Sequence, residues 1–163
     1  MRNGKKPANA GLKLSSFSMK HVLVILVLVA ACQTKHSMNA GQQEMIDNYI
    51  RAYNAFDIEG MCRDLHEDVI FQNVSNGEVD LETKGLAAFK EQAQKAKDIF
   101  SEREQKITKI HQAADSATVS IDYTGVLAVD ISEQMKAGDT LRLHGKSTFY
   151  FQGGEIIKIV DES

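Results

Sequence analysis

Two polar side chains are expected to lie among apolar ones, where they could bind another polar atom. Successive residues of a strand point to opposite faces of a sheet, so Asn73 shares a face with Val69 and Phe71. By the same alternation, Ser147 points with Phe149. The Asn73 amide can orient a carbonyl group or a water molecule, but it has no basic site near neutral pH. The pattern therefore indicates polar recognition within an apolar surface.

Three further residues could contribute to such a site. Tyr49 and Tyr53 fall on the apolar stripe of a predicted helix. Either their rings fill core space, or one hydroxyl faces a cavity and, with Asn73 and Ser147, binds a polar atom of an apolar ligand. Asp161, near the end of the last predicted strand, is a candidate for the rim of the pocket. The alternative for Asp161 is a solvated or hydrogen-bonded carboxylate without a catalytic role.

The remaining titratable candidates do not form a recognisable site. They are Asp64, His66, His111, Asp122 and His144. Asp122 alternates away from Ile121, and His144 shares its face with Lys146, so we expect both on an outer face. The histidines and acids show no HExxH or similar spacing. We therefore predict neither a metal site nor a cofactor.

The elements that would position these residues follow from hydrophobic periodicity. Apolar residues at helical spacing predict a helix over 42–56, and a second, short helix follows the N-cap residue Asp57 and ends near His66. A third helix follows Gly85, with an apolar stripe that runs to Phe100.

Alternating segments predict the strands. They cover 69–74, a return strand to about 83, 103–113, 117–129, 140–152 and 155–161. Ser75-Asn76-Gly77 and Gly153-Gly154 are turn signals between neighbouring strands. Three helices followed by a long antiparallel sheet indicate an α+β fold.

The beginning of the chain has the pattern of an export signal. Lys20 precedes an apolar run over 22–29, which has about half of the roughly 20 residues that a membrane-spanning helix needs. The run leads into Val-Ala-Ala-Cys, which resembles the bacterial lipobox. We therefore predict a signal peptide over residues 1–31 and lipidation at Cys32.

Several consequences follow for the location of the protein. Residues 32–40 would form a lipid-anchored tether, so the membrane is an expected partner through the N-terminal lipid. The domain would lie on the periplasmic side of a bacterial cell envelope, and Gln33 by analogy favours the outer membrane where the host has one. Met19 would open a compact signal by itself, and we expect it to be the true start, with residues 1–18 an artefact of gene prediction.

Charge and cysteine content narrow the function classes. Residues 1–31 hold five of the 19 basic residues and no acidic one, which leaves 14 basic against 22 acidic residues and a formal charge of −8. A nucleic-acid partner is therefore disfavoured. With Cys32 lipidated, Cys62 has no disulfide partner, and its place on an apolar helix face suits a core residue better than a nucleophile. Residues 41–163 have the size of one domain.

The segment Tyr49-Ile50-Arg51-Ala52-Tyr53-Asn54-Ala55-Phe56-Asp57 lies near the front of this series of elements. Together with the order of the elements, it resembles the nuclear transport factor 2-like superfamily, most closely its SnoaL-like branch. The resemblance extends over about residues 40–161 and includes Gly85 and the segment Phe149-Tyr150-Phe151. It implies that the three N-terminal helices pack in a strongly curved, mainly antiparallel sheet. The sheet would form a cone with an apolar pocket inside.

The resemblance also allows a test of one chemistry. In ketosteroid isomerases of this superfamily, a carboxylate base works beside an oxyanion hole that contains a tyrosine and a protonated acid. The resemblance places Tyr49 on that tyrosine, Asn73 on the base and Ser147 near the second acid. Because asparagine cannot abstract a carbon-bound proton, isomerase chemistry of that type is disfavoured.

Three functions remain open at this point. We favour a lipid-anchored binding or accessory module whose pocket holds a small hydrophobic molecule or is vestigial. The second is a SnoaL-like enzyme, a lyase, cyclase, isomerase or hydrolase, that acts on an apolar metabolite. The third is a structural role through a partner protein or a homodimer formed by the outer sheet face, which carries Tyr150 and Thr148.

Overall fold

The computed structural model describes residues 40–163, together with Met1. The predicted signal peptide over residues 1–31, the start at Met19, the lipidation site Cys32 and nearly all of the tether lie outside the described residues. No helix among the described residues is long and apolar enough to cross a membrane. The predictions about the N-terminal segment stay predictions.

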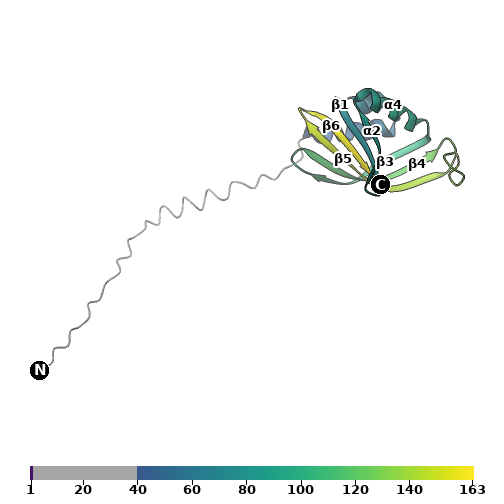
Figure 1. Ribbon diagram of the computed structural model, residues 1–163. Coiled ribbons are helices and arrows are strands. Elements are labelled where there is room, and N and C mark those ends of the chain that lie inside the picture. Colours follow the sequence, from purple (N-terminus) through teal and green to yellow (C-terminus); the bar gives the residue numbers. More distant parts are fainter. Residues whose placement is uncertain (2–39) are drawn as a thin grey trace. The chain divides into compact units, whose positions relative to one another are not determined.

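Three helices pack against one face of the sheet (Figure 1). They are α2 (Ala40–Asn54), α3 (Ile58–Cys62) and α4 (Leu86–Lys97). Helix α2 buries Ile46, Tyr49 and Ile50, which recur at the spacing of one helix face. Helix α4 buries Phe89 and Ala93 in the same way. The predicted apolar stripes are therefore the faces that meet the sheet.

Helix α3 begins as predicted and ends earlier. The Asp57 side chain caps it by accepting a hydrogen bond from the Gly60 amide at 2.9 Å. The predicted end near His66 is wrong, because the helix ends at Cys62 and a strand begins at Leu65. Leu65 pairs with Ile156 of the last strand, a partner about ninety residues away that the local pattern cannot reveal.

Six strands form a single curved sheet (Figure 1). They are β1 (Leu65–Ser75), β2 (Glu78–Lys84), β3 (Phe100–Gln112), β4 (Ser116–Leu127), β5 (Thr140–Gln152) and β6 (Glu155–Glu162). The spatial order is β2-β1-β6-β5-β4-β3, and of these pairs only β1 with β6 is parallel. The predicted α+β class, with helices packed in a mainly antiparallel curved sheet, is confirmed.

Several strand boundaries differ from the prediction: β1 begins at Leu65 and not at 69, β4 ends at Leu127 and not at 129, and β3 begins at Phe100 and not at 103. Phe100 was expected to continue the third helical stripe, but it opens β3 and pairs with Leu127 of β4. Its ring meets the Tyr123 ring edge to face at 5.8 Å between centroids. The helix therefore ends at Lys97, where the sheet supplies better partners for an aromatic ring than another helical turn does.

Two predicted turns place the C-terminal strand. Asn76 and Gly77 connect β1 to β2 with φ of 53° and 83°, a region that asparagine and glycine enter readily. Gly153 and Gly154 connect β5 to β6 with φ of 64° and 91°. This second turn folds the last strand back between β5 and β1, where Asp161 comes to lie beside Ser147.

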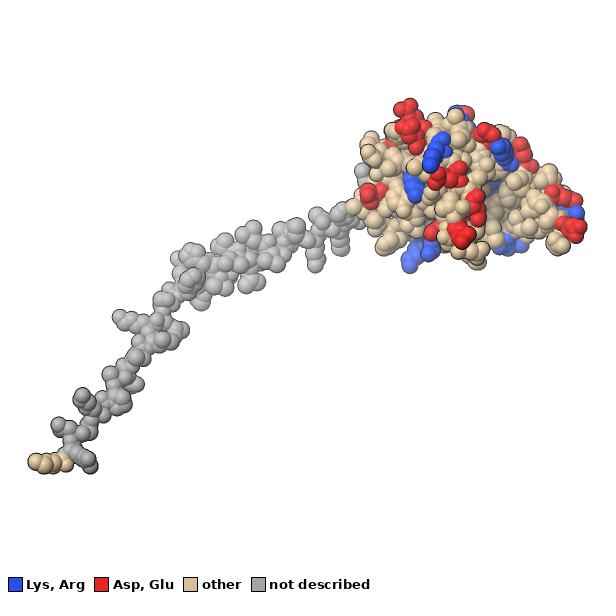
Figure 2. Space-filling view, viewed as in Figure 1, with Lys and Arg blue, Asp and Glu red and all other residues tan. Residues whose placement is uncertain are grey.

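The core lies between the helices and the inner face of the sheet. Tyr49 of α2 meets Phe149 of β5 edge to face, with ring centroids 5.4 Å apart. Phe89 of α4 packs on Phe71 of β1 in a similar arrangement at 5.6 Å. Figure 2 shows acidic and basic side chains interspersed over the visible face of the domain. The aromatic core therefore lies beneath a surface of mixed charge, and the candidate polar residues lie at its edge.

Candidate functional site

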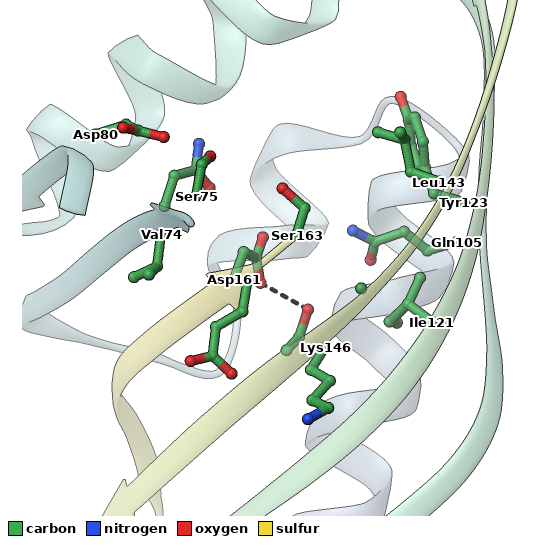
Figure 3. A pocket seen from close by; sticks show the side chains of 14 residues that line it. Val74, Ser75, Asp80, Gln105, Ile121, Tyr123, Leu143, Lys146, Asp161 and Ser163 are labelled. Carbon is green, nitrogen blue, oxygen red and sulfur yellow. Dashed lines mark hydrogen bonds between the residues drawn. The ribbon is translucent and has the colours of Figure 1, made fainter. Parts of the chain in front are cut away.

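Three adjacent strands hold three polar side chains in a row. Asn73 on β1 is the register partner of Asp161 on β6, and Asp161 is the register partner of Ser147 on β5. Directly paired residues project from the same face of a sheet. The Ser147 hydroxyl donates a hydrogen bond of 2.6 Å to the Asp161 carboxylate (Figure 3, dashed line). We call Asn73, Asp161 and Ser147 the polar row.

The Asp161 carboxyl has an unusual electrostatic environment. The residue is only half-buried, yet protein atoms surround its carboxyl, and this desolvation raises its pKa from 3.8 to about 6. The Ser147 hydrogen bond acts in the opposite direction and lowers the pKa. A carboxyl with a pKa near 6 exchanges its proton easily at physiological pH, which is the property of a general acid or base.

Two hollows meet at the polar row. The inner cavity, of about 120 Å³, lies between the helices and the sheet. Its aromatic and apolar wall includes Tyr49, Tyr53, Met61, Phe71 and Phe89, and its polar wall includes Asn73, Arg103 and Asp161. The outer pocket, of about 220 Å³, is drawn in Figure 3 and shares Asn73 and Asp161 with the inner cavity. Asp161 therefore lines both hollows.

Both tyrosines of α2 line the inner cavity. Tyr49 is buried, and burial together with the nearby Asp161 charge raises its pKa well above the usual value. Burial also raises the pKa of Tyr53, while the charge of Arg103 opposes that rise. Both groups are therefore neutral phenols. The two interpretations of Tyr49 are compatible, because its ring packs in the core and the residue also lines the cavity.

Arg103 of β3 is a functional candidate that the sequence reasoning missed. The side chain is 6% exposed, and its Nε donates a hydrogen bond of 2.8 Å to the Tyr53 carbonyl. The guanidinium lies over the rings of Tyr53 and Phe56, with its central carbon 3.8 Å and 4.3 Å from their centroids. A buried Nη2 atom has no hydrogen-bond partner among the described residues.

Gln105 and Tyr123 were missed as site residues as well. They are register partners on β3 and β4, and both line the outer pocket. The alternation of residues in β3 could have placed these side chains on the inner face, because Arg103 and Gln105 share a face with Ile107. Charged and amide side chains on a strand are usually solvated, so this signal was weak.

Comparison with known proteins identifies the family. A family model described as the SnoaL-like domain matches residues 46–159. The chain belongs to the SnoaL-like family. None of the curated proteins compared with the chain matches it.

Solved structures share the SnoaL-like fold. A proposed polyketide cyclase from Xanthomonas campestris is 21% identical, covers 78% of this chain and 93% of its own, and superposes with a TM-score of 0.67. A proposed polyketide cyclase from Pseudomonas putida is 26% identical, with coverages of 77% and 91% and a TM-score of 0.59. A proposed SnoaL-like polyketide cyclase from Shewanella denitrificans is 16% identical, with coverages of 76% and 90% and a TM-score of 0.62.

Within this SnoaL-like domain, the acid does not stand where the ketosteroid isomerase pattern would place it. The β1 position holds Asn73, and the carboxyl is on the adjacent strand β6 as Asp161. Asp161 and Ser147 make a direct contact, and Tyr49 lies close enough for its pKa to respond to the Asp161 charge. The polar row therefore contains a carboxyl group, but this group comes from β6 and not from β1.

Other reactive side chains of the SnoaL-like domain lie apart from this site. His144 and Asp122 are exposed and contact each other at 2.8 Å. Cys62 is buried, and desolvation raises the pKa of its thiol to about 11, which disfavours the reactive thiolate. Within residues 40–163, no cluster of three or more histidine, cysteine or acidic side chains could hold a metal ion.

Proposed function

We propose that this SnoaL-like domain is a proton-transfer enzyme that acts on a small, largely apolar carbonyl compound, with Asp161 as the general base and acid. The observation that carries the proposal is the Asp161 carboxyl itself. It lines an aromatic cavity, it accepts a hydrogen bond from Ser147, and its pKa lies near 6. Tuning of a carboxyl toward neutrality by burial is a recurrent device for acid and base catalysis.

Each residue of the site has a role in this scheme. The Asp161 carboxylate removes a proton from the carbon next to the substrate carbonyl, and the electron pair of the C–H bond moves into the enolate. The neutral Tyr49 hydroxyl and the Asn73 amide are donors that can hydrogen-bond to the developing enolate oxygen. Ser147 holds the carboxylate in place. The protonated Asp161 then returns the proton to carbon, either at the same position or after bond rearrangement.

The proposal can be tested without the natural substrate. The probe is 2-tetralone, an apolar bicyclic ketone, whose α-protons exchange with deuterium from D2O and can be followed by NMR. We expect the protein to accelerate this exchange and Asp161→Asn to reduce the acceleration by at least about 100-fold, the usual lower range for a general base. Asp122→Asn is the matched control, because Asp122 is an exposed carboxylate on β4. Equal exchange rates in the two variants would contradict the proposal.

A non-catalytic binding module is the second candidate. The observation that favours it is the small volume of the inner cavity, about 120 Å³, whose wall is mainly aromatic and apolar. A protein of this kind would bind a small hydrophobic molecule and leave it unchanged. Binding of 2-tetralone without accelerated exchange would support this candidate over the enzyme.

We propose further that the domain is lipid-anchored at Cys32 in a bacterial cell envelope. The support is the sequence pattern of Lys20, the apolar run over 22–29 and the Val-Ala-Ala-Cys motif. Metabolic labelling with a clickable palmitate analogue in an expressing bacterium should label the protein. The Cys32→Ser variant should lose the label, whereas the Cys62→Ser variant should keep it. Equal labelling of the Cys32→Ser variant would contradict the anchor.

A homodimer through the outer sheet face is a further proposal, by analogy with the family. Its support is the partly exposed aromatic ring of Tyr150 on β5, which a partner copy could cover. Light scattering would report the mass of the protein in solution, and Tyr150→Glu should convert a dimer to a monomer. A monomeric mass for the unaltered protein would contradict the proposal.

A further inference from the structure

Arg103 is a buried cation without a counter-charge. It is 6% exposed, and no carboxylate forms an ion pair with it among the described residues, Asp161 included. An arginine side chain stays charged at any pH that proteins tolerate, so the cost of its burial is not relieved by proton loss. Charges buried in this way are normally paired. Its orphaned Nη2 therefore requires an explanation.

The chain keeps this cation in place at a conformational cost. Phe56, whose ring lies under the guanidinium, has φ of 58°, in the left-handed region that bulky residues rarely enter. It follows the end of α2, at the position where glycine is usual. Strained positions of this kind are concentrated at ligand-binding and active sites. The fold thus places an aromatic support under Arg103 where a glycine would cost less.

Two more buried polar atoms lie on the same part of the sheet. They are the Gln105 Oε1 atom of β3, which has no hydrogen-bond partner among the described residues, and the hydroxyl of its register partner Tyr123 on β4, which interacts with the Tyr53 side chain. The Tyr123 hydroxyl lies beside Gly125, which is the register partner of Arg103. A Cβ atom at Gly125 would come within 2.7 Å of that hydroxyl, so the glycine keeps the space open. We call Arg103, Gln105 and Tyr123 the β3–β4 polar cluster.

These atoms lie toward a different part of the sheet from Asp161. The cluster is on β3 and β4, whereas Asp161 is on β6, with β5 between them. Figure 3 shows Gln105 and Tyr123 on one side of the outer pocket and Asp161 on the other. The pKa values of Tyr49 and Tyr53 respond to both Asp161 and Arg103, so both phenols lie near the cation and near the carboxyl.

We infer that the β3–β4 polar cluster binds a carboxylate group of the substrate through Arg103, which lines the inner cavity, so that the substrate is a small, largely apolar organic acid. The inference rests on the proposed function in that it concerns the same site, and it adds the chemical class of the substrate. A carboxylate would supply the charge that Arg103 lacks and an acceptor for its Nη2 atom. The Gln105 amide can present either a donor or an acceptor by rotation.

Direct binding distinguishes this inference from simple hydrophobic uptake. The probes are 1-naphthoate and its uncharged analogue 1-naphthamide, titrated into the full-length protein by calorimetry at neutral pH. We expect the carboxylate to bind at least about tenfold more tightly than the amide, as a charge-assisted hydrogen bond in a buried site implies. Equal affinities, or no naphthoate binding up to about 1 mM, would overturn the inference.

Variants assign the preference to Arg103. Arg103→Met should remove the preference for 1-naphthoate, while Arg142→Met, on the exposed face of β5, should keep it. A preference that survives in a folded Arg103→Met protein would overturn the inference. If that variant does not fold, the side-chain Nε–H signal of Arg103 in the unaltered protein provides the readout by NMR. Naphthoate should shift this signal and naphthamide should not, and equal shifts would overturn the inference.

Asp161→Asn separates this inference from the proposed catalysis. The variant keeps Arg103 and should retain the preference for 1-naphthoate even where proton exchange is lost. Conversely, an Asp161→Asn protein with an unchanged rate of proton exchange and an intact preference for the carboxylate would contradict the catalytic proposal. The inference of a carboxylate-binding site would be unaffected. Loss of the preference in Asp161→Asn would show that the site does not depend on the β3–β4 polar cluster alone, and would overturn the inference as stated.

Discussion

At the residue scale, the position of a carboxyl within the fold decides the chemistry more than the residue type at one family position. Asn73 occupies the place where an isomerase would carry its base, and on that ground the sequence argues against proton abstraction. The register of the parallel β1–β6 pair then sets Asp161 directly beside Asn73. Its pKa near 6 and its Ser147 hydrogen bond are the reasons for our proposal that the base comes from this neighbouring strand.

The raised pKa of Asp161 predicts a pH-dependent stability. Because burial raises the folded-state pKa from 3.8 to about 6, the folded protein binds this proton more tightly than the unfolded chain does. The stabilisation is full below about pH 4 and is lost as the pH rises through about 6. Asp161→Asn should therefore increase the free energy of unfolding at pH 8 by about 3 kcal/mol and change it little at pH 4. Urea unfolding at the two pH values measures this, and an equal effect at both would contradict the assignment.

Ser147 is expected to tune Asp161. Its hydroxyl stabilises the carboxylate form, so Ser147→Ala should raise the pKa of Asp161 above about 6. The carboxyl carbon signal of Asp161, followed by NMR as the pH is changed, reports the value directly. Ser120→Ala on β4 serves as the control, because Ser120 lies outside the polar row. An unchanged or lower pKa in Ser147→Ala would show that the hydrogen bond has no electrostatic role.

At the element scale, the parts of the fold that depend on local pattern were predictable from the sequence. Helical stripes predicted α2 and α4, and alternation placed Asn73 and Ser147 on the inner face. The predicted boundaries are wrong where pairing with a distant strand outweighs the local sequence pattern. His66 belongs to β1 because that strand pairs with β6, and Phe100 belongs to β3 because it pairs with β4.

The candidate site was only partly predictable for a similar reason. Alternation indicates which face a side chain occupies, but the alignment of Asp161 between Asn73 and Ser147 depends on the register of two strand pairs. The β3–β4 polar cluster was missed because Arg103 and Gln105 are residue types that usually face solvent. Only the depth of the curved sheet shows that Arg103 is buried and that Gln105 is half-buried.

The close approach of β5 and β6 next to the site gives a prediction for an element. A Cβ atom at Gly145 would lie 2.6 Å from the Glu162 carbonyl oxygen, a backbone atom that cannot move without shifting β6. Gly145→Ala should therefore destabilise the protein by about 1–3 kcal/mol and disturb the neighbouring Asp161–Ser147 contact. Chemical denaturation measures the loss, with Lys146→Ala, at an exposed position, as the control. Unchanged stability in Gly145→Ala would show that β6 adjusts freely.

At the scale of the whole molecule, the chain combines an N-terminal sequence pattern for export with a SnoaL-like domain over residues 46–159. The pattern supports a proposal about where the protein acts, and the domain supports a proposal about what it does. Both proposals are consistent with a small apolar acid as substrate at a cell envelope. They can fail separately, because lipidation at Cys32 and proton transfer at Asp161 depend on different residues.

The central claim is that Asp161 transfers protons within the cavity, and the pH dependence of α-proton exchange in 2-tetralone tests it most directly. If Asp161 is the base, the protein-catalysed exchange rate should rise with pH and level off with an apparent pKa of about 6, the value of its carboxyl. The rise should be absent in Asp161→Asn and present in Asp122→Asn. A rate that shows no inflection near pH 6, or the same profile in Asp161→Asn as in the unaltered protein, would contradict the account.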